Sequence, residues 1–198
     1  MATPMLALPR AGTGGDAEGR RGILPLGASV AGAGVLMVMA GLVGAYVALK
    51  SATAAWPPQD TEFDNYTATT LTLTLLMAMT SIEWAAYGIR KGFRGQALFA
   101  FALAIGLALA HLNGLAYLVN GFEFAIGSSA YATVVHALCI VPFLAGLVAL
   151  GGVVHVTLRA IGHQLTVENL SLLRGAAILW HVASIAWFIA YYTVYVTK

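Results

Sequence analysis

The chain has 198 residues, of which 60% are hydrophobic and only 9% carry a charge. With a mean hydropathy of +0.83, it is too apolar for an ordinary soluble domain, and this composition predicts an integral membrane protein. A net charge of +2, spread over short connections, forms no basic patch of the kind that binds nucleic acid, so no nucleic-acid partner is expected.

Five apolar segments are each long enough to cross a hydrocarbon core of about 30 Å. They predict transmembrane helices at approximately 27–49, 67–89, 96–118, 131–158 and 175–197. The predicted fold class is therefore all-α, an integral membrane bundle of five helices over residues 27–198. Residues 1–26 are expected to form a polar N-terminal tail that precedes it. Pro142, inside the fourth segment, is expected to kink that helix.

The basic residues gather at one end of the predicted bundle. Eight of them fall in the N-terminal tail or next to the connections that follow the second and fourth segments, whereas Lys50 and Lys198 lie at the other end. Because basic loops tend to stay in the cytoplasm, we expect a cytoplasmic N-terminus and an external C-terminus. Tyrosines near the outer ends of the spans are expected to anchor the protein at the interface: Tyr66, Tyr117, Tyr131, Tyr191, Tyr192 and Tyr195.

Sequence patterns of common catalytic and metal sites are missing. There is no phosphate-binding glycine loop, no zinc-protease His-Glu-x-x-His and no nucleophile elbow. The one cysteine, Cys139, lies in an apolar segment and has no intrachain partner for a disulfide or a thiolate metal site. We expect the chain itself to contain no catalytic, cofactor-binding or metal-binding residue.

Glu83 is an ionisable residue inside a predicted span, near the cytoplasmic end of the second helix. A charge in hydrocarbon is costly, so such a residue is a functional candidate by default. One interpretation is a proton carrier. The other, and the commoner arrangement, is a carboxylate that pairs with a neighbouring subunit or reaches the interface.

Four histidines also fall within the predicted spans. His111 and His136 lie near the outer leaflet, and His155 and His181 lie near the inner leaflet, which is the arrangement of a two-heme membrane cytochrome. The geometry opposes this interpretation, because His136 and His155 lie on one helix at positions roughly 100° apart around its axis. Each neutral histidine can instead bind a hydroxyl, a carbonyl or a facing helix.

Glycines inside the spans predict close helix packing. Gly41 in the first segment and Gly146 in the fourth are the predicted packing positions. Small residues let helix backbones approach each other in a membrane. They favour either a compact bundle or docking against a larger membrane subunit, and composition does not separate the two.

Short motifs follow one another along residues 27–198: Trp56-Pro57-Pro58 after the first segment, Tyr117 in the third, Ser128-Ser129-Ala130-Tyr131 opening the fourth, and Trp180-His181 with Trp187 in the last. In this order and spacing they resemble the heme-copper (cytochrome c) oxidase subunit III family, in its short five-helix bacterial form. The resemblance is divergent. The family's intramembrane glutamates fall on Val35 and Leu118, its His-Gly-Leu-His on residues 142–145, and its aspartate after Trp-His on Ser184.

The resemblance implies a non-catalytic accessory subunit of a respiratory terminal oxidase in a bacterial plasma membrane. Such a subunit would stabilise oxidase subunit I, which holds the heme and copper that reduce oxygen, and would support lipid binding and proton uptake. Its other partners would be further oxidase subunits, phospholipid and a larger respiratory supercomplex. Three alternatives stay open: a subunit III-like protein of a nitric oxide reductase, a bis-histidine heme b electron carrier, and a small transporter with a hydrated path near Glu83.

Overall fold

A computed structural model describes residues 14–57, 62–165 and 170–197 of the chain. Its helices are α1 (Gly14–Ala52), α2 (Asn65–Lys91), α3 (Arg94–Asn120), α4 (Ala130–Ile161) and α5 (Ser171–Tyr191), and α5 continues into a π-helical turn, η1 (Tyr192–Val196). No strand occurs in these residues. The predicted all-α architecture with five helices is confirmed. Pro58, predicted as part of the Trp-Pro-Pro motif, and residues 1–13 of the predicted tail lie outside the described residues.

One helix differs from the sequence-based expectation in its extent. α1 begins at Gly14, so residues 14–26, expected to belong to the polar tail, form its first turns. Local propensity does not account for this extension, because four of residues 14–22 are glycine, a poor helix former. α4 runs through Pro142 and remains helical on both sides of it.

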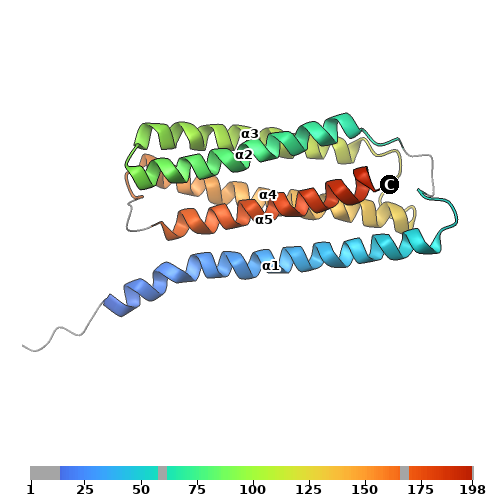
Figure 1. Ribbon diagram of the computed structural model, residues 1–198, viewed down its shortest axis with the longest axis horizontal. Helices are drawn as coiled ribbons and strands as arrows, with labels where there is room; N and C mark the ends of the chain where they lie inside the picture. Colours follow the sequence, from blue (N-terminus) through green and yellow to red (C-terminus); the bar gives the residue numbers. More distant parts are fainter. Residues whose placement is uncertain (1–13, 58–61, 166–169, 198) are drawn as a thin grey trace, which may run out of the picture.

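Successive helices run in alternating directions, so α1 begins at one end of the bundle and α5 finishes at the opposite end (Figure 1). α5 packs against α1, α2 and α4, while α3 packs against α2 and α4. At the end where the chain finishes, Lys50 Nζ donates a hydrogen bond of 2.5 Å to the carbonyl oxygen of Thr197. This contact fastens the end of α1 to the end of the chain.

The turn between α2 and α3 is only two residues long, Gly92 and Phe93. Gly92 adopts φ = +76°, a left-handed conformation that glycine reaches without a steric penalty, and its N–H bonds back to the carbonyls of Gly88 and Ile89. Gly88 then lies directly against α3, because a Cβ added there would come within 3.1 Å of the Ala97 backbone nitrogen. α2 and α3 therefore form a tight antiparallel hairpin.

Charged side chains separate toward the two ends of the bundle. The end where α1 begins also holds Arg90, Lys91, Arg94, Arg159 and Arg174, and the opposite end holds Lys50, Glu62, Asp64 and Glu123. Arg94 makes contacts at the basic end. Its guanidinium donates to the carbonyl of Ile161 over 2.6 Å and contacts the ring of His163. These contacts join the α2–α3 turn to the end of α4.

Four helices are long and apolar enough to cross a membrane: α1 from Ile23 onward, α3, α4, and α5 together with η1. The chain is accordingly a membrane-embedded protein. α2 is as long as α3, at 27 residues, but it is more polar because it carries a series of threonines. Their hydroxyls bond to backbone carbonyls one turn earlier, for example Thr70 to Tyr66 and Thr74 to Thr70, which satisfies each donor within the helix itself.

Candidate functional site

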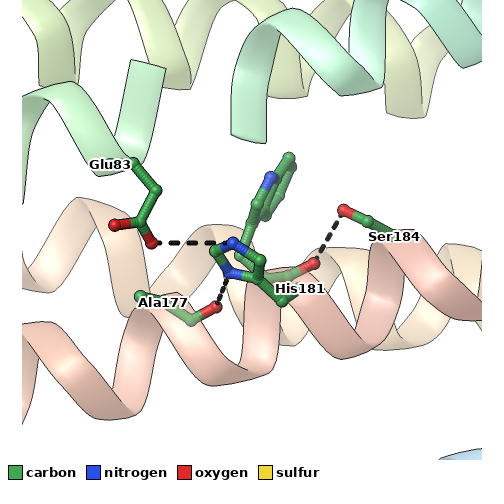
Figure 2. Close-up of polar contacts among 5 residues, drawn as sticks. Glu83, Ala177, His181 and Ser184 are labelled. Atoms are coloured by element: carbon green, nitrogen blue, oxygen red, sulfur yellow. Dashed lines mark hydrogen bonds and ion pairs between the residues drawn. The ribbon is translucent and has the colours of Figure 1, made fainter. Parts of the chain in front are cut away.

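Glu83 of α2 and His181 of α5 come together between their two helices (Figure 2). His181 Nε2 lies 3.6 Å from Glu83 Oε1. The other ring nitrogen, Nδ1, lies 2.6 Å from the carbonyl oxygen of Ala177, one turn earlier in α5. The Glu83 side chain is 54% exposed and the His181 side chain 34% exposed. Glu83 and His181, which lie far apart in the sequence, thus form one site.

The hydrogen bond to Ala177 fixes the proton arrangement of this site. A carbonyl oxygen only accepts, so Nδ1 of His181 carries a hydrogen and donates it. Nε2 then faces a carboxylate oxygen, and two bare acceptors would repel each other. One additional proton on the pair turns the same contact into an attraction between opposite charges. The 3.6 Å contact between Glu83 and His181 is therefore an ion pair when His181 is charged, and it links α2 to α5.

The pair lies well inside the length of the bundle. Glu83 is eight residues before the end of α2 at Lys91, and His181 is ten residues after the start of α5 at Ser171. At 1.5 Å per residue these positions are roughly 12 Å and 15 Å from the helix ends. Both residues lie in the half of the bundle nearer the basic end.

The two tryptophans of the α5 motif point into the interior. Trp187 and Trp180 are almost completely buried, and Trp187 Nε1 donates a 3.0 Å hydrogen bond to Thr72 Oγ1 of α2. Within the described part of the chain, Trp180 Nε1 has no hydrogen-bond partner. Ser184 is buried and donates to the Trp180 carbonyl over 2.8 Å (Figure 2). Its hydroxyl is used within α5.

His111 of α3 packs beside Trp187 in the interior of the bundle. Its Nδ1 lies 3.1 Å from the carbonyl oxygen of Leu71 in α2, and its ring stands edge-on to Trp187 with centroids 5.5 Å apart. The histidine therefore joins α3 to α2 by a hydrogen bond and to α5 by a ring contact. This is one of the alternatives expected for a buried neutral histidine.

Trp56, of the Trp-Pro-Pro motif, packs onto Tyr131, which opens α4. The two rings are perpendicular with centroids 5.0 Å apart, and both touch Tyr46 of α1. Trp56 Nε1 donates to the Tyr46 hydroxyl over 3.3 Å. Pro57 follows Trp56 through a cis peptide bond. Two motifs that lie far apart in the sequence thus meet at the end of the bundle opposite the basic residues.

His136 and His155 do not extend either cluster into a heme site. His136 Nδ1 donates to the Ala132 carbonyl over 2.8 Å, and its ring stands edge-on to Phe122 and Phe124. His155 is exposed on α4. In residues 14–57, 62–165 and 170–197, no three His, Cys, Asp or Glu side chains lie together in a way that could hold a metal ion. The Nδ1 contact fixes the orientation of the His136 ring.

Tyr117 lies at the end of α3 and is largely exposed. It lines a small pocket of about 140 Å³ together with Glu62, Phe63, Asp64 and Phe122. Asp64 caps α2, and hydrogen bonds from the Thr67 hydroxyl and N–H hold the pKa of its carboxyl below the ordinary value of 3.8. This carboxylate is therefore committed to starting α2, which explains why the helix begins at Asn65.

An apolar groove of about 450 Å³ lies between α1, α4 and α5. Val35 is one of its lining residues, and every other lining side chain is also apolar or glycine. Residue 35 of this chain therefore has no side chain that can ionise. The polar chemistry in the spans lies instead on the other side of α5, at Glu83 and His181.

The two glycines chosen for helix packing have different surroundings. Gly146 of α4 faces α3, because a Cβ there would lie 2.9 Å from Leu112 Cδ2. Gly41 is exposed on α1, and a Cβ there would meet nothing within 4 Å. Packing within the bundle thus uses Gly146, whereas Gly41 leaves a shallow spot on the outer surface.

Two contributors to these sites were not singled out from the sequence, namely Thr72 and Tyr46. Thr72 was one of many threonines in its segment, and only its facing Trp187 distinguishes it. Tyr46 carried a weak signal, since it is a tyrosine one turn before the end of an apolar helix and ten residues before Trp56.

No protein-family model matches the chain, and no curated protein matches it either.

Proposed function

We propose that this chain is an accessory subunit of a heme-copper terminal oxidase, similar to the short bacterial subunit III. It would pack beside the catalytic subunit, which holds the heme and copper, and would stabilise it in the bacterial plasma membrane. In this proposal all five helices cross the bilayer, with the basic end in the cytoplasm, and α2 crosses with its threonine hydroxyls satisfied by its own backbone.

The observation that carries the proposal is the contact between Trp56 and Tyr131. The resemblance selects these residues independently, one from the Trp-Pro-Pro motif and one from the Ser-Ser-Ala-Tyr motif, and they are 75 positions apart in the sequence. Their meeting in one aromatic cluster supports a fold in which both motifs serve the same structural purpose. The burial of Trp180 and Trp187 adds support from a third motif.

A proton-related role is part of the proposal and belongs to Glu83 and His181. The family's glutamate positions are Val35 and Leu118 here, so those residues cannot exchange protons. We assign this role to the Glu83–His181 pair, which lies about 12 Å from the basic end. We expect Glu83→Gln to slow proton uptake by the complex while the amount of assembled complex stays unchanged.

Affinity purification of the tagged chain from its native membrane in mild detergent tests the proposal. All co-purifying proteins are identified by mass spectrometry. A heme-copper catalytic subunit recovered in fixed proportion is the expected result, and its sequence would distinguish an oxygen-reducing enzyme from a nitric oxide reductase. Recovery of this chain alone would overturn the proposal, and a heme b spectrum from the isolated chain would redirect attention to the electron-carrier alternative.

A further inference from the structure

α2 presents a continuous line of outward-facing residues that ends in polar chemistry. Leu73, Leu76, Thr80 and Glu83 are all exposed, and they follow one another at steps of three and four residues. Steps of this kind place side chains along one seam of a helix, the pattern by which a helix packs against another helix. On α5, His181 and Ile185 border this seam. We call these six residues the α2–α5 face.

This face differs from the outward faces of the neighbouring helices. The large exposed side chains of α1 include Val30, Met37 and Val47, and those of α4 include Leu144, Leu147 and Val148. The surface of α1 suits lipid chains, whereas α4 exposes His155 in addition to its apolar side chains. The α2–α5 face instead exposes a carboxylate and a histidine well inside the bundle, where contact with hydrocarbon is costly.

Glu83 still has an unused acceptor. Only one of its carboxylate oxygens is directed at His181, and the other points away from that ring (Figure 2). Within the described residues, the pairing with His181 is its one hydrogen-bonding or ionic contact. Lipid tails offer no donor to the second oxygen.

Thr80 adds a second acceptor to the same face. Its hydroxyl already donates to the Met77 carbonyl over 2.9 Å, so outward it offers only lone pairs. The face contains no Lys or Arg. The complementary surface is therefore one that supplies donors.

We infer that the α2–α5 face is the surface that docks onto the catalytic subunit, through a transmembrane helix that presents a basic or amide side chain to the free oxygen of Glu83. This inference rests on the proposed function and assigns its contact surface. It differs from docking through exposed glycine, because Gly41 lies on α1, where the large exposed side chains between Ile23 and Val47 are apolar.

Photocrosslinking in native membranes tests the assignment. A benzophenone amino acid replaces Leu76 on the α2–α5 face, or Val47 of α1 or Val148 of α4 as matched exposed controls, in the otherwise complete chain. The expected result is an adduct with the heme-copper catalytic subunit from position 76 and not from positions 47 or 148, with the partner identified by mass spectrometry.

Two Glu83 variants then test the chemistry. In the crosslinkable chain, Glu83→Leu removes both acceptors and is expected to lower the adduct yield roughly tenfold, which corresponds to losing one hydrogen bond to a charged group. Glu83→Gln keeps an oxygen acceptor at the same place and should retain most of the yield. Circular dichroism of each purified variant verifies that the helices are intact.

Several outcomes would overturn the inference. Adducts with the catalytic subunit from position 47 or 148 but not 76 would refute the face while leaving the proposed function standing. Adducts from position 76 that contain only lipid or a second copy of the chain would also refute it. If the catalytic subunit is neither crosslinked from any position nor recovered by affinity purification, the proposed function falls as well.

Discussion

The indole nitrogen of Trp187 donates a hydrogen bond of 3.0 Å to the hydroxyl of Thr72, and so joins α5 to α2 in the interior of the bundle. The same hydroxyl donates to the Ala68 carbonyl. Thr72 therefore serves as acceptor and donor at once, and the hydroxyl cannot be replaced by a methyl group without leaving the buried indole N–H unpaired.

Thr72→Val is expected to lower the free energy of unfolding by about 1–3 kcal/mol, the range for an unpaired buried polar group. Thr70→Val is the matched control, because the Thr70 hydroxyl bonds only to its own helix, at the Tyr66 carbonyl. Denaturant titration in detergent micelles, followed by tryptophan fluorescence, measures both. Equal losses in the two variants would show that the hydrogen bond across the helices contributes nothing.

Gly32 and Gly34 form a second matched pair, two positions apart on α1. A Cβ at Gly32 would lie 2.6 Å from Val182 Cγ2, whereas a Cβ at Gly34 would meet nothing within 4 Å. Because the Val182 side chain is stiff, Gly32→Ala should destabilise the bundle by about 1–3 kcal/mol. Gly34→Ala should be neutral or stabilise it by up to about 1 kcal/mol through helix propensity. Thermal unfolding in micelles ranks them, and the reverse order would contradict the α1–α5 packing.

Coupling between Glu83 and His181 is accessible through a double-mutant cycle with Glu83→Gln and His181→Gln. Both side chains are more than one-third exposed, so we expect a modest interaction free energy of about 0.3–1 kcal/mol. The control cycle combines Glu83→Gln with His155→Gln on α4, for which additive effects are expected. If the first cycle is also additive, the pair does not interact in the folded chain.

The Asp64 cap predicts a pH dependence. Its folded pKa is lowered by hydrogen bonds from Thr67, so its stabilising effect is complete above the ordinary value of 3.8 and is lost as the pH falls through the lower folded value. The wild-type chain should melt at a higher temperature than Asp64→Ala at pH 7, and this difference should shrink below about pH 4. A difference that stays constant from pH 7 to pH 2.5 would indicate that the carboxylate charge is not involved.

The sequence predicts the helices well because a long apolar segment of a membrane protein has few alternatives to a helix. Each of the first four predicted spans falls within one observed helix, and the fifth covers most of α5 together with η1. α1 begins earlier than the apolar span predicts. A polar segment such as residues 14–22 can extend an existing helix beyond the part that is apolar. Hydropathy reports where a chain meets lipid and says little about where a helix begins.

The candidate site was only partly predictable. Glu83 stands out as a carboxylate in an apolar segment, and His181 as part of the Trp-His motif. Their contact depends on how α2 and α5 are rotated and shifted against each other, which no local pattern encodes. The same limit applies to Gly41 and Gly146, which look alike in sequence but face outward and inward, respectively.

The two-residue turn at Gly92 also bears on how the chain enters a bilayer during synthesis. α2 is the least apolar helix, and α3, which follows it after this turn, is among the helices apolar enough to span a membrane. A marginal segment joined so closely to a strongly apolar one is expected to leave the translocon together with it, as a helical hairpin. With a glycosylation reporter, α2 alone should therefore insert poorly, and insertion should be restored when the Gly92 turn and α3 are included.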